Sequence, residues 1–350
     1  MCIDIDLFQN DLLTWYDEYA RDLPWRKDAN PYYIWVSEIM LQQTRVEAVK
    51  TYFARFIKRL PTIWDLALCE DDELQKLWEG LGYYNRLWNM KKCAILCTEK
   101  YNGKLPSTYE VLLSLPGIGM YSAGAIASIA YKEVVAAVDG NVLRVFSRLL
   151  ASYDDIGKEA TKKKFHSLIQ PYISKTRPDA FNQALMEIGA MVCVPNARAR
   201  CNICPIVKHC QAYAQGIEQV LPIKAKAKKR RIEKHTIIVM VCNGQVVLKK
   251  RASNGLLANL YEFINLENTY SIKELTQMYA SWDIKQIKKL TSSKHIFSHV
   301  EWHMQGYLMV VGDVKSEQLV SYLDIKEKYA LPTALKVYKD WVMEYLKWKS

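Results

Sequence analysis

The sequence lacks any apolar stretch long enough to cross a membrane, since none approaches the roughly 18 residues that a spanning helix needs. Its first residues, Met1 to Thr14, are acidic and amphipathic, and they lack the basic start and apolar run of a secretory signal. Internal repeats and low-complexity tracts are missing as well. We therefore expect a cytoplasmic protein with no membrane partner.

Negative charge is in deficit: 48 Lys and Arg residues outnumber 37 Asp and Glu residues. A positive surplus suits a polyanionic partner, because each neutralised phosphate releases condensed counterions. Charge alone is equally consistent with a merely basic protein. Half of the 350 residues are hydrophobic, which is enough to bury more than one core, and a length prior of about 150 residues per domain suggests two.

The spacing of apolar residues changes once along the chain. From residue 1 to about 218 they recur every three or four positions, as at Leu12, Trp15 and Tyr19, which predicts helices throughout. The charged run within 219–234 is too polar to bury, so it predicts a linker. An all-α domain over 1–218 is therefore expected to precede the linker.

Residues 235–350 predict a smaller α+β domain. Two β-branched runs flank Asn243-Gly244, a strong signal for a two-residue hairpin because both positions require positive φ. Met304–Val311 predicts a further strand, whereas Lys273–Ala280 and Lys315–Leu323 predict helices.

Four of the nine cysteines, in a protein expected to stay in a reducing compartment, fall within the loop 193–210. These are Cys193, Cys201, Cys204 and Cys210, and the other five are predicted to be small core residues. Four thiolates can hold either zinc or an iron–sulfur cluster. The single CxxC pair and the asymmetric spacing favour a [4Fe–4S] cluster, with zinc and four unliganded thiols as alternatives.

The segment Leu115-Pro-Gly-Ile-Gly119 predicts a tight turn between a helix ending at Leu115 and a helix beginning near Met120. Gly117 and Gly119 would let the backbone approach a ligand, and the free N–H groups at the new helix start attract anions. This turn resembles the helix-hairpin-helix motif that binds a DNA phosphate. By itself the pattern is also typical of a plain turn between packed helices.

Two acidic motifs complete an ordered set. Glu38 lies in Ser37-Glu-Ile-Met-Leu-Gln-Gln-Thr-Arg45, and Asp139 lies in Val138-Asp-Gly-Asn-Val142. With the hairpin and the four cysteines in this order, the chain resembles MutY-type adenine DNA glycosylases of the endonuclease III, or helix-hairpin-helix, superfamily. The resemblance covers the helical region nearly end to end and continues through Phe297-Ser298-His299.

Cleavage of an N-glycosidic bond builds positive charge on the sugar and negative charge on the base, so it requires an acid and an ionised carboxylate. Apolar neighbours such as Ile34 and Ile39 should raise the pKa of Glu38. The resemblance implies that Glu38 protonates adenine at N7. It implies that Asp139, oriented by Asn141, stabilises the sugar cation or acts as a transient nucleophile. Taken singly, the two would be a solvated helix Glu and a helix-capping Asp.

A lysine is missing where the strand-cleaving members of the superfamily carry their nucleophile. Tyr121 stands at that position, and a phenol cannot form an imine. A monofunctional glycosylase that uses water is therefore expected, with Tyr121 positioning the sugar or Asp139.

The resemblance also implies residues that contact DNA. Gln43 and Tyr83 would fill the gap left by the flipped base, and Arg26 and Gln183 would contact the flipped adenine. Aromatic residues of this kind are also common in cores.

The C-terminal domain of the family resembles Nudix hydrolases and recognises 8-oxoguanine opposite the adenine. Here the segment 255–262 is not followed by the Arg-Glu-x-x-Glu-Glu pattern that binds the metal, so nucleotide hydrolysis is not expected. Phe297 would supply a stacking plane and Ser298 and His299 polar contacts. A plain turn is the alternative for these three residues.

The sequence therefore predicts a base excision repair enzyme, a monomeric adenine glycosylase acting on double-stranded DNA with adenine opposite 8-oxoguanine or guanine. The lack of a nuclear or mitochondrial signal favours a bacterial, nucleoid-associated activity. A pyrimidine or thymine-mismatch glycosylase is the nearest alternative, and a non-catalytic iron–sulfur regulator is the alternative from another class.

Overall fold

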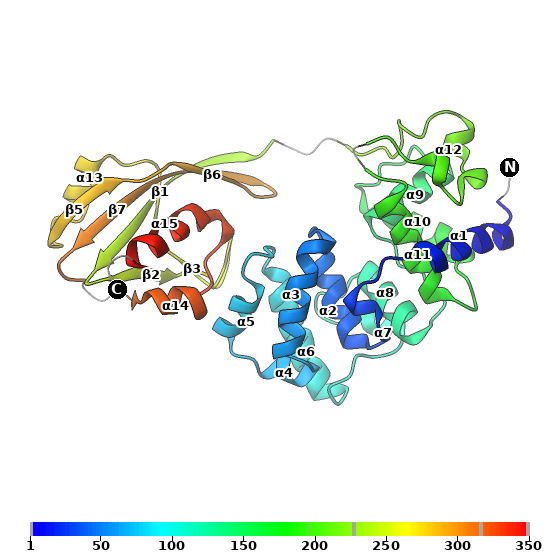
Figure 1. Ribbon diagram of the computed structural model, residues 1–350, viewed down its shortest axis with the longest axis horizontal. Helices are drawn as coiled ribbons and strands as arrows, with labels where there is room; N and C mark the ends of the chain where they lie inside the picture. The colour runs from blue at the N-terminus through cyan, green and yellow to red at the C-terminus, as the bar shows by residue number, and fades with distance from the viewer. Residues whose placement is uncertain (1–2, 196, 226–228, 315–317, 348–350) are drawn as a thin grey trace. The chain divides into compact units, whose positions relative to one another are not determined.

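The computed structural model describes residues 3–195, 197–225, 229–314 and 318–347. Contacts divide the chain into two compact units, Met1–Leu68 with Trp88–Lys226 and Cys69–Leu87 with Ala227–Ser350. We call them the first and the second unit (Figure 1). Within the described ranges no helix combines the length and the apolar character that a membrane span requires.

The first unit is helical, as the apolar spacing predicts. The helix that begins at Pro31 shows a typical N-cap. The Asn30 side chain accepts hydrogen bonds from the amides of Tyr32 and Tyr33, and Pro31 lies in the first turn. Its helices are α1 (Ile5–Tyr19), α2 (Pro31–Leu41), α3 (Val46–Arg59), α4 (Ile63–Leu68), α6 (Asn85–Lys100, which starts in the second unit), α7 (Tyr109–Leu113), α8 (Met120–Tyr131), α9 (Gly140–Leu149), α10 (Glu159–Ile169), α11 (Pro178–Met191) and α12 (Gln211–Ala214). Single 3₁₀ turns lie at Pro24–Arg26, Gln170–Tyr172, Cys201–Ile203 and Val207–His209.

Helices α1, α9 and α11 enclose one apolar core of this unit. Phe8 of α1 contacts Phe146 of α9 and Phe181 of α11 edge to face, with ring centroids 6.3 Å and 6.0 Å apart. Cys193, Cys204 and Cys210 lie against the same core. The cysteine loop is therefore attached to the helix that begins next to Asp139.

The second unit is built on a mixed sheet that has eight strands within the described residues. Its central strands β1 and β7 run parallel, from Arg231 opposite Val300 to Cys242 opposite Val311, and the other pairs are antiparallel. The strands are β1 (Arg231–Cys242), β2 (Gln245–Lys250), β3 (Tyr261–Glu262), β4 (Ile264–Glu267), β5 (Ile284–Lys289), β6 (Ser293–Ile296), β7 (Val300–Val311) and β8 (Gln318–Val320). The helices are α5 (Asp71–Trp78), α13 (Ile272–Met278), α14 (Tyr322–Glu327) and α15 (Lys336–Lys347), with a 3₁₀ turn at Thr333–Leu335.

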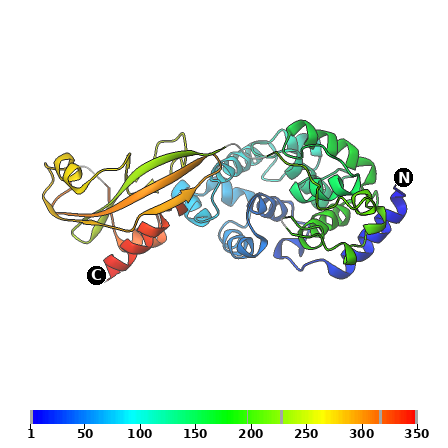
Figure 2. The ribbon, with the colours of Figure 1, turned by 90° about the horizontal axis from the view of Figure 1, so that it is seen from above.

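Alternation along β1 distributes its side chains between two cores. Ile237 and Val239 face a core that includes Tyr338 of α15, whereas Ile238 lies in a second core with Leu275 of α13. Successive residues of a strand point to opposite faces, so the two helices cover opposite sides of the sheet (Figure 2).

Three expectations for this unit are confirmed and one is wrong. The strand expected at Met304–Val311 lies within β7. Asn243 and Gly244 form the hairpin turn, with φ of 48° and 75°, and α13 occupies the helix expected near 273–280. The helix expected at 315–323 is wrong: residues 318–320 form β8 paired with β2, and 315–317 lie outside the described residues. The helix α14 begins only after Ser321, because Ser321 and Asp324 form a capping box there.

The segment expected to be a linker, 219–234, contributes to the sheet at its end. Strand β1 already begins at Arg231, where its amide bonds the carbonyl oxygen of His299 at 3.2 Å. Residues 226–228 of this segment lie outside the described residues.

Candidate active site

A cavity of about 1530 Å³ opens in the first unit. It lies where the ends of α2 and the 3₁₀ turn at Pro24–Arg26 meet the starts of α8 and α9 and the middle of α11. All four residues predicted to be catalytic line it: Glu38, Tyr121, Asp139 and Asn141. Segments about 100 residues apart in the sequence thus supply a single site.

Glu38 is a buried carboxyl in the apolar helix α2, with 5% of its surface exposed. Burial raises the pKa of Glu38 to about 7, and the negative charge of Asp139 acts in the same direction. The hydrogen bond from Tyr121 and the charge of Arg26 oppose this shift. Glu38 can therefore hold a proton near neutral pH.

Tyr121 lies in the first turn of α8, directly after the hairpin. Its hydroxyl donates a hydrogen bond to Oε2 of Glu38. Burial raises the pKa of Tyr121 well above its ordinary value, so the phenol stays protonated as a donor. The sequence placed this side chain beside the sugar or Asp139, whereas in the structure its hydrogen-bond partner is the other carboxyl.

Asp139 is the N-cap of α9, so the capping role considered for it is real and coexists with a place in the cavity. Its Oδ1 accepts the Val142 amide and its Oδ2 accepts the Asn141 side chain, both at 2.7 Å. Burial raises the pKa of Asp139, but these hydrogen bonds favour its ionised form. Asp139 accepts hydrogen bonds at both of its oxygens, so it is better suited than Glu38 to lose its proton first.

Helix α9 connects this carboxylate to the cysteine loop. The Arg144 guanidinium donates to the side-chain oxygen of Asn141 at 2.8 Å and to the carbonyl oxygen of Cys193 at 2.7 Å. Gly189 of α11 allows Asn141 to approach, because a Cβ at Gly189 would lie 2.4 Å from the Asn141 Cβ. The orientation of Asn141, and through it that of Asp139, is therefore fixed from two sides.

Glu187 is a site residue that the sequence reasoning missed. It is 1% exposed, and both of its oxygens accept hydrogen bonds from Arg21 at 2.7 Å, while Arg26 donates to Oε1 at 2.8 Å. Burial alone would raise the pKa of Glu187, but Arg21 and Arg26 outweigh it and the net shift is downward. The available signal was an acidic residue within a largely apolar helix: Glu187 is the charged residue among the buried positions of α11.

The hairpin turn requires glycine at position 117, both for its positive φ and for its close packing against Asn89. Gly117 has φ of 75°, and a Cβ there would lie 2.5 Å from the Asn89 Cβ. Gly119 caps α8 without any side-chain hydrogen bond, which leaves the first amides of α8 without a capping side chain. Helix α8 begins at Met120 as expected, but the preceding helix ends at Leu113 rather than at Leu115.

The predicted DNA-contacting residues are dispersed. Arg26 and Gln43 line the cavity, but Gln183 is not among its lining residues and donates to the carbonyl oxygen of Asp179 in its own helix at 3.2 Å. Tyr83 belongs to the second unit and is 48% exposed. Gln43 and Tyr83 share one feature: each is a non-glycine residue with positive φ, of 60° and 48°.

The three residues of the predicted 8-oxoguanine contact form the turn between β6 and β7. Phe297 is half-buried, and its ring meets Trp302 at 5.1 Å between centroids. Ser298 and His299 are exposed. The loop thus presents two polar side chains, while the aromatic ring is partly engaged by its own core.

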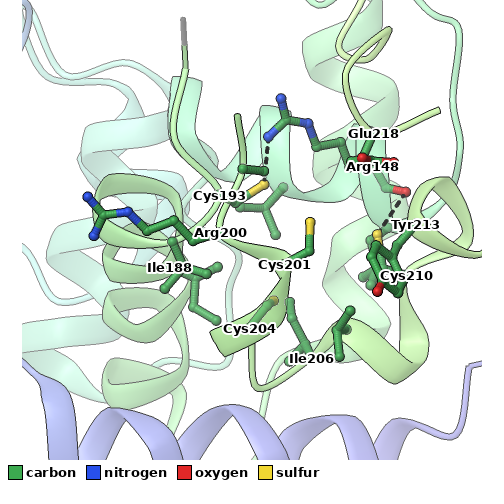
Figure 3. Close-up of a pocket in the computed structure, with 15 residues that line it drawn as sticks. Arg148, Ile188, Cys193, Arg200, Cys201, Cys204, Ile206, Cys210, Tyr213 and Glu218 are labelled. Carbon is green, nitrogen blue, oxygen red and sulfur yellow. Dashed lines mark hydrogen bonds between the residues drawn. The ribbon is translucent and has the colours of Figure 1, made fainter. Parts of the chain in front are cut away.

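The four clustered cysteines line one pocket beside α9 and α11 (Figure 3). Arg148 donates to the sulfur of Cys193 at 3.1 Å, and the Cys210 thiol donates to the Arg148 carbonyl oxygen at 3.5 Å. Burial raises the pKa of Cys204 to about 12, so a thiolate there would need a compensating cation. No three His, Cys, Asp or Glu side chains among the described residues are arranged to hold a single metal ion.

Comparisons with known proteins identify the families of the two domains. The family model of HhH-GPD superfamily base excision DNA repair proteins matches residues 36–171, and that of the NUDIX domain matches residues 235–340. The predicted fold class, a helix-hairpin-helix domain followed by a Nudix-like α+β domain, is confirmed.

Individual relatives share most of the chain. Identity to the adenine DNA glycosylase of Rattus norvegicus is 35%, over 88% of this chain and 71% of the relative. Identity to the adenine DNA glycosylase of Buchnera aphidicola subsp. Baizongia pistaciae (strain Bp) is 33%, over 88% and 87%. A solved thermostable thymine-DNA glycosylase matches with a TM-score of 0.54 and 27% identity, over 60% of this chain and 97% of that one.

The raised pKa of Glu38 predicts a measurable dependence of stability on pH. The folded-state pKa of about 7 exceeds the ordinary value of 4.5. The stability contributed by the protonated carboxyl is therefore complete below 4.5 and is lost as the pH rises through 7. Urea unfolding gives the free energy of unfolding at each pH. The value for Glu38→Gln minus the value for the wild type should rise by on the order of 1–3 kcal/mol from about pH 5 to about pH 8.5, because the wild type loses stability over this range. As a control, Glu110→Gln changes an exposed residue and should show the same dependence of unfolding free energy on pH as the wild type. If Glu38→Gln also showed the wild-type dependence, the raised pKa of Glu38 would be contradicted.

Proposed function

Because this chain belongs to the adenine DNA glycosylases of the helix-hairpin-helix superfamily, we propose that it excises adenine opposite 8-oxoguanine or guanine through Glu38 and Asp139. It is a hydrolytic DNA N-glycosylase of base excision repair, and its partner is DNA. We further propose that it acts as a monomer on double-stranded DNA.

The observation that carries this mechanism is the pair of carboxyls in one cavity, one suited to hold a proton and the other to lose it. The proton of Glu38 passes to the leaving adenine at N7 as the bond between the base and the sugar breaks, and the bond electrons leave with the base. The ionised Asp139 faces the positive sugar carbon. Water then adds to this carbon and loses a proton to the Glu38 carboxylate or to solvent.

Tyr121 supports the first step of the mechanism. A donor at Oε2 orients the carboxyl of Glu38 and leaves its other oxygen to carry the proton. Because a phenol forms no imine, the sugar is released by water and the strand stays intact.

Replacement of Glu38 by Gln should lower the single-turnover rate of adenine excision by about 10²–10⁴-fold, since the amide supplies no proton. The substrates are duplexes with adenine opposite 8-oxoguanine, adenine opposite guanine and thymine opposite guanine, each treated with alkali after incubation. The wild-type rate should also fall as the pH rises above about 7, as Glu38 ionises.

Cleavage at thymine would support the thymine-mismatch alternative, and binding without any cleavage would support the regulator. Lys162 and Lys224 line the cavity. A borohydride-trapped adduct that depends on either lysine would refute the monofunctional mechanism.

Recognition of 8-oxoguanine is proposed for the turn at residues 297–299. The exposure of Ser298 and His299 supports this role, since base edges are read by hydrogen bonds from polar side chains. The position of the turn is set by Arg230, which donates to the Phe297 carbonyl oxygen at 3.0 Å.

Replacement of both Phe297 and Ser298 by Ala should reduce the preference for adenine opposite 8-oxoguanine over adenine opposite guanine by about 10-fold, the value of one good base contact. The ratio of the two single-turnover rates measures the preference. A matched pair of exposed changes on α13, Lys273→Ala with Thr276→Ala, should leave the ratio unchanged. An unchanged ratio in the Phe297 and Ser298 variant would refute the role.

A [4Fe–4S] cluster is proposed for the cysteine pocket, held by Cys193, Cys201, Cys204 and Cys210. The four cysteines line one pocket. Their single CxxC pair and asymmetric spacing support a [4Fe–4S] cluster rather than zinc, although both groups accept four thiolates. Bound there, the cluster would supply the positive charge that the buried thiolates require and would hold the loop against α9.

The purified protein should contain about four iron and four sulfide atoms per chain and absorb visible light. Cys204→Ser should lose both the iron and the absorbance, whereas Cys242→Ser, a buried cysteine of the second unit, should retain them. Stoichiometric zinc in place of iron would contradict the assignment.

A further inference from the structure

Helix α5 belongs to the glycosylase region by sequence and to the second unit by its contacts. The matched glycosylase family model spans residues 36–171, and α5 with the following turn lies inside that span. Contacts nevertheless group Cys69–Leu87 with Ala227–Ser350. The segment that carries Tyr83 is thus part of the same compact unit as the Nudix-like domain.

The first turn of α5 is attached to the sheet of this unit through Asp72. One carboxylate oxygen of Asp72 accepts Lys250 at 3.0 Å, and the other accepts the Tyr261 hydroxyl at 3.1 Å. Lys250 is on β2 and Tyr261 on β3, so a single side chain contacts two paired strands.

The C-terminal end of α5 is attached to the same unit through Glu79, its C-cap residue. Its Oε1 accepts Lys339 of α15 at 2.5 Å and the Leu331 amide at 3.0 Å, and its Oε2 accepts Lys76 at 2.7 Å. Lys76 also donates to the carbonyl oxygens of Ile325 and Tyr329. Burial alone would raise the pKa of Glu79, but the two lysines and the amide outweigh it and lower the pKa, so the carboxylate stays ionised near neutral pH.

The turn that follows Glu79 is rigid and ends in an exposed aromatic ring. The buried Trp78 indole donates to the Gly82 carbonyl oxygen at 3.0 Å. Arg86 donates to the carbonyl oxygens of Leu81 and Gly82, and its guanidinium lies 5.5 Å from the Tyr83 ring centroid. Tyr83 itself is half exposed in a left-handed conformation. An exposed aromatic residue in a left-handed conformation, next to a turn held by these hydrogen bonds, is typical of a functional position.

We propose that Glu79 is a positioning residue that fixes the Gly80–Tyr83 turn to the Nudix-like domain, so that this domain sets where Tyr83 enters the DNA. Glu79 immediately precedes the turn, and three groups of the second unit hold its carboxylate. A shift of α15 or of the segment around Leu331 would move Glu79, and the turn would move with it because Gly80 directly follows Glu79 in the chain. This inference rests on the proposed function in one respect, that Tyr83 fills the gap left by the flipped adenine.

The test uses the full-length protein and a duplex with 2-aminopurine next to an adenine opposite 8-oxoguanine. In a Glu38→Gln background, insertion of Tyr83 should change the 2-aminopurine fluorescence on binding, and Tyr83→Ala should abolish the change. Glu79→Ala and Lys339→Met should each reduce it. With Glu38 intact, the same two variants should lower the single-turnover rate by about 10- to 100-fold, as expected for a displaced contact.

Lys336→Met is the matched control, since Lys336 is on the same helix α15 and pairs with exposed Asp340 rather than with Glu79. It should leave the fluorescence change and the rate as in the wild type. In a Tyr83→Ala background, Glu79→Ala should cause no further loss of rate, because both changes remove the same contact.

Additive losses for Glu79→Ala and Tyr83→Ala would overturn the proposal and show a general structural effect. An unchanged fluorescence signal in both Glu79→Ala and Lys339→Met would overturn it as well, and Lys339→Met decides the matter if Glu79→Ala does not fold. Absence of adenine excision by the wild type would count against the proposed function instead. The fluorescence change needs no chemistry, so it still decides the role of Glu79 in that case.

Discussion

The site depends on one constraint, that two carboxyls share one cavity and differ in how readily each holds a proton. Burial disfavours both charges. Asp139 offsets this cost with a backbone amide and the Asn141 side chain. The hydrogen bond described for Glu38 comes from the Tyr121 hydroxyl, and burial raises the pKa of Glu38 to about 7. The arrangement is unfavourable for folding near neutral pH, and the packed helices around it compensate for that cost.

Helix α9 is the element that joins the parts of the first unit. Its N-terminus presents Asp139, its first turns carry Asn141 and Arg144, and Arg148 contacts the cysteine loop. Displacement of the loop around Cys193 would therefore disturb the donors that hold Asp139. The structural role proposed for the loop and the chemical role proposed for Asp139 at the start of α9 would both depend on the same short network.

In the second unit, a similar connection links the Nudix-like sheet to the turn that carries Tyr83. Lys76 and Glu79 are partly buried charges, and such charges are stabilised by pairing and hydrogen bonding. Their partners lie on α15 and beside α14, about 250 residues further along the chain. The domain boundary in the fold is thus displaced from the boundary in the sequence, because these contacts outweigh chain proximity.

Local patterns in the sequence determined much of the protein. Apolar spacing predicted the helical region, and Asn243-Gly244 predicted the hairpin. The ordered motifs predicted the family and the pair of carboxyls. Each of these features depends on neighbouring residues or on a distinctive spacing. The capping box at Ser321 was also local but was overlooked. Only the tertiary structure decided that Tyr121 bonds Glu38, that Glu187 holds Arg21 and Arg26, and that α5 joins the second unit. Those pairings join residues separated by tens to hundreds of positions. Their strength depends on burial in the folded state, which no local sequence pattern predicts.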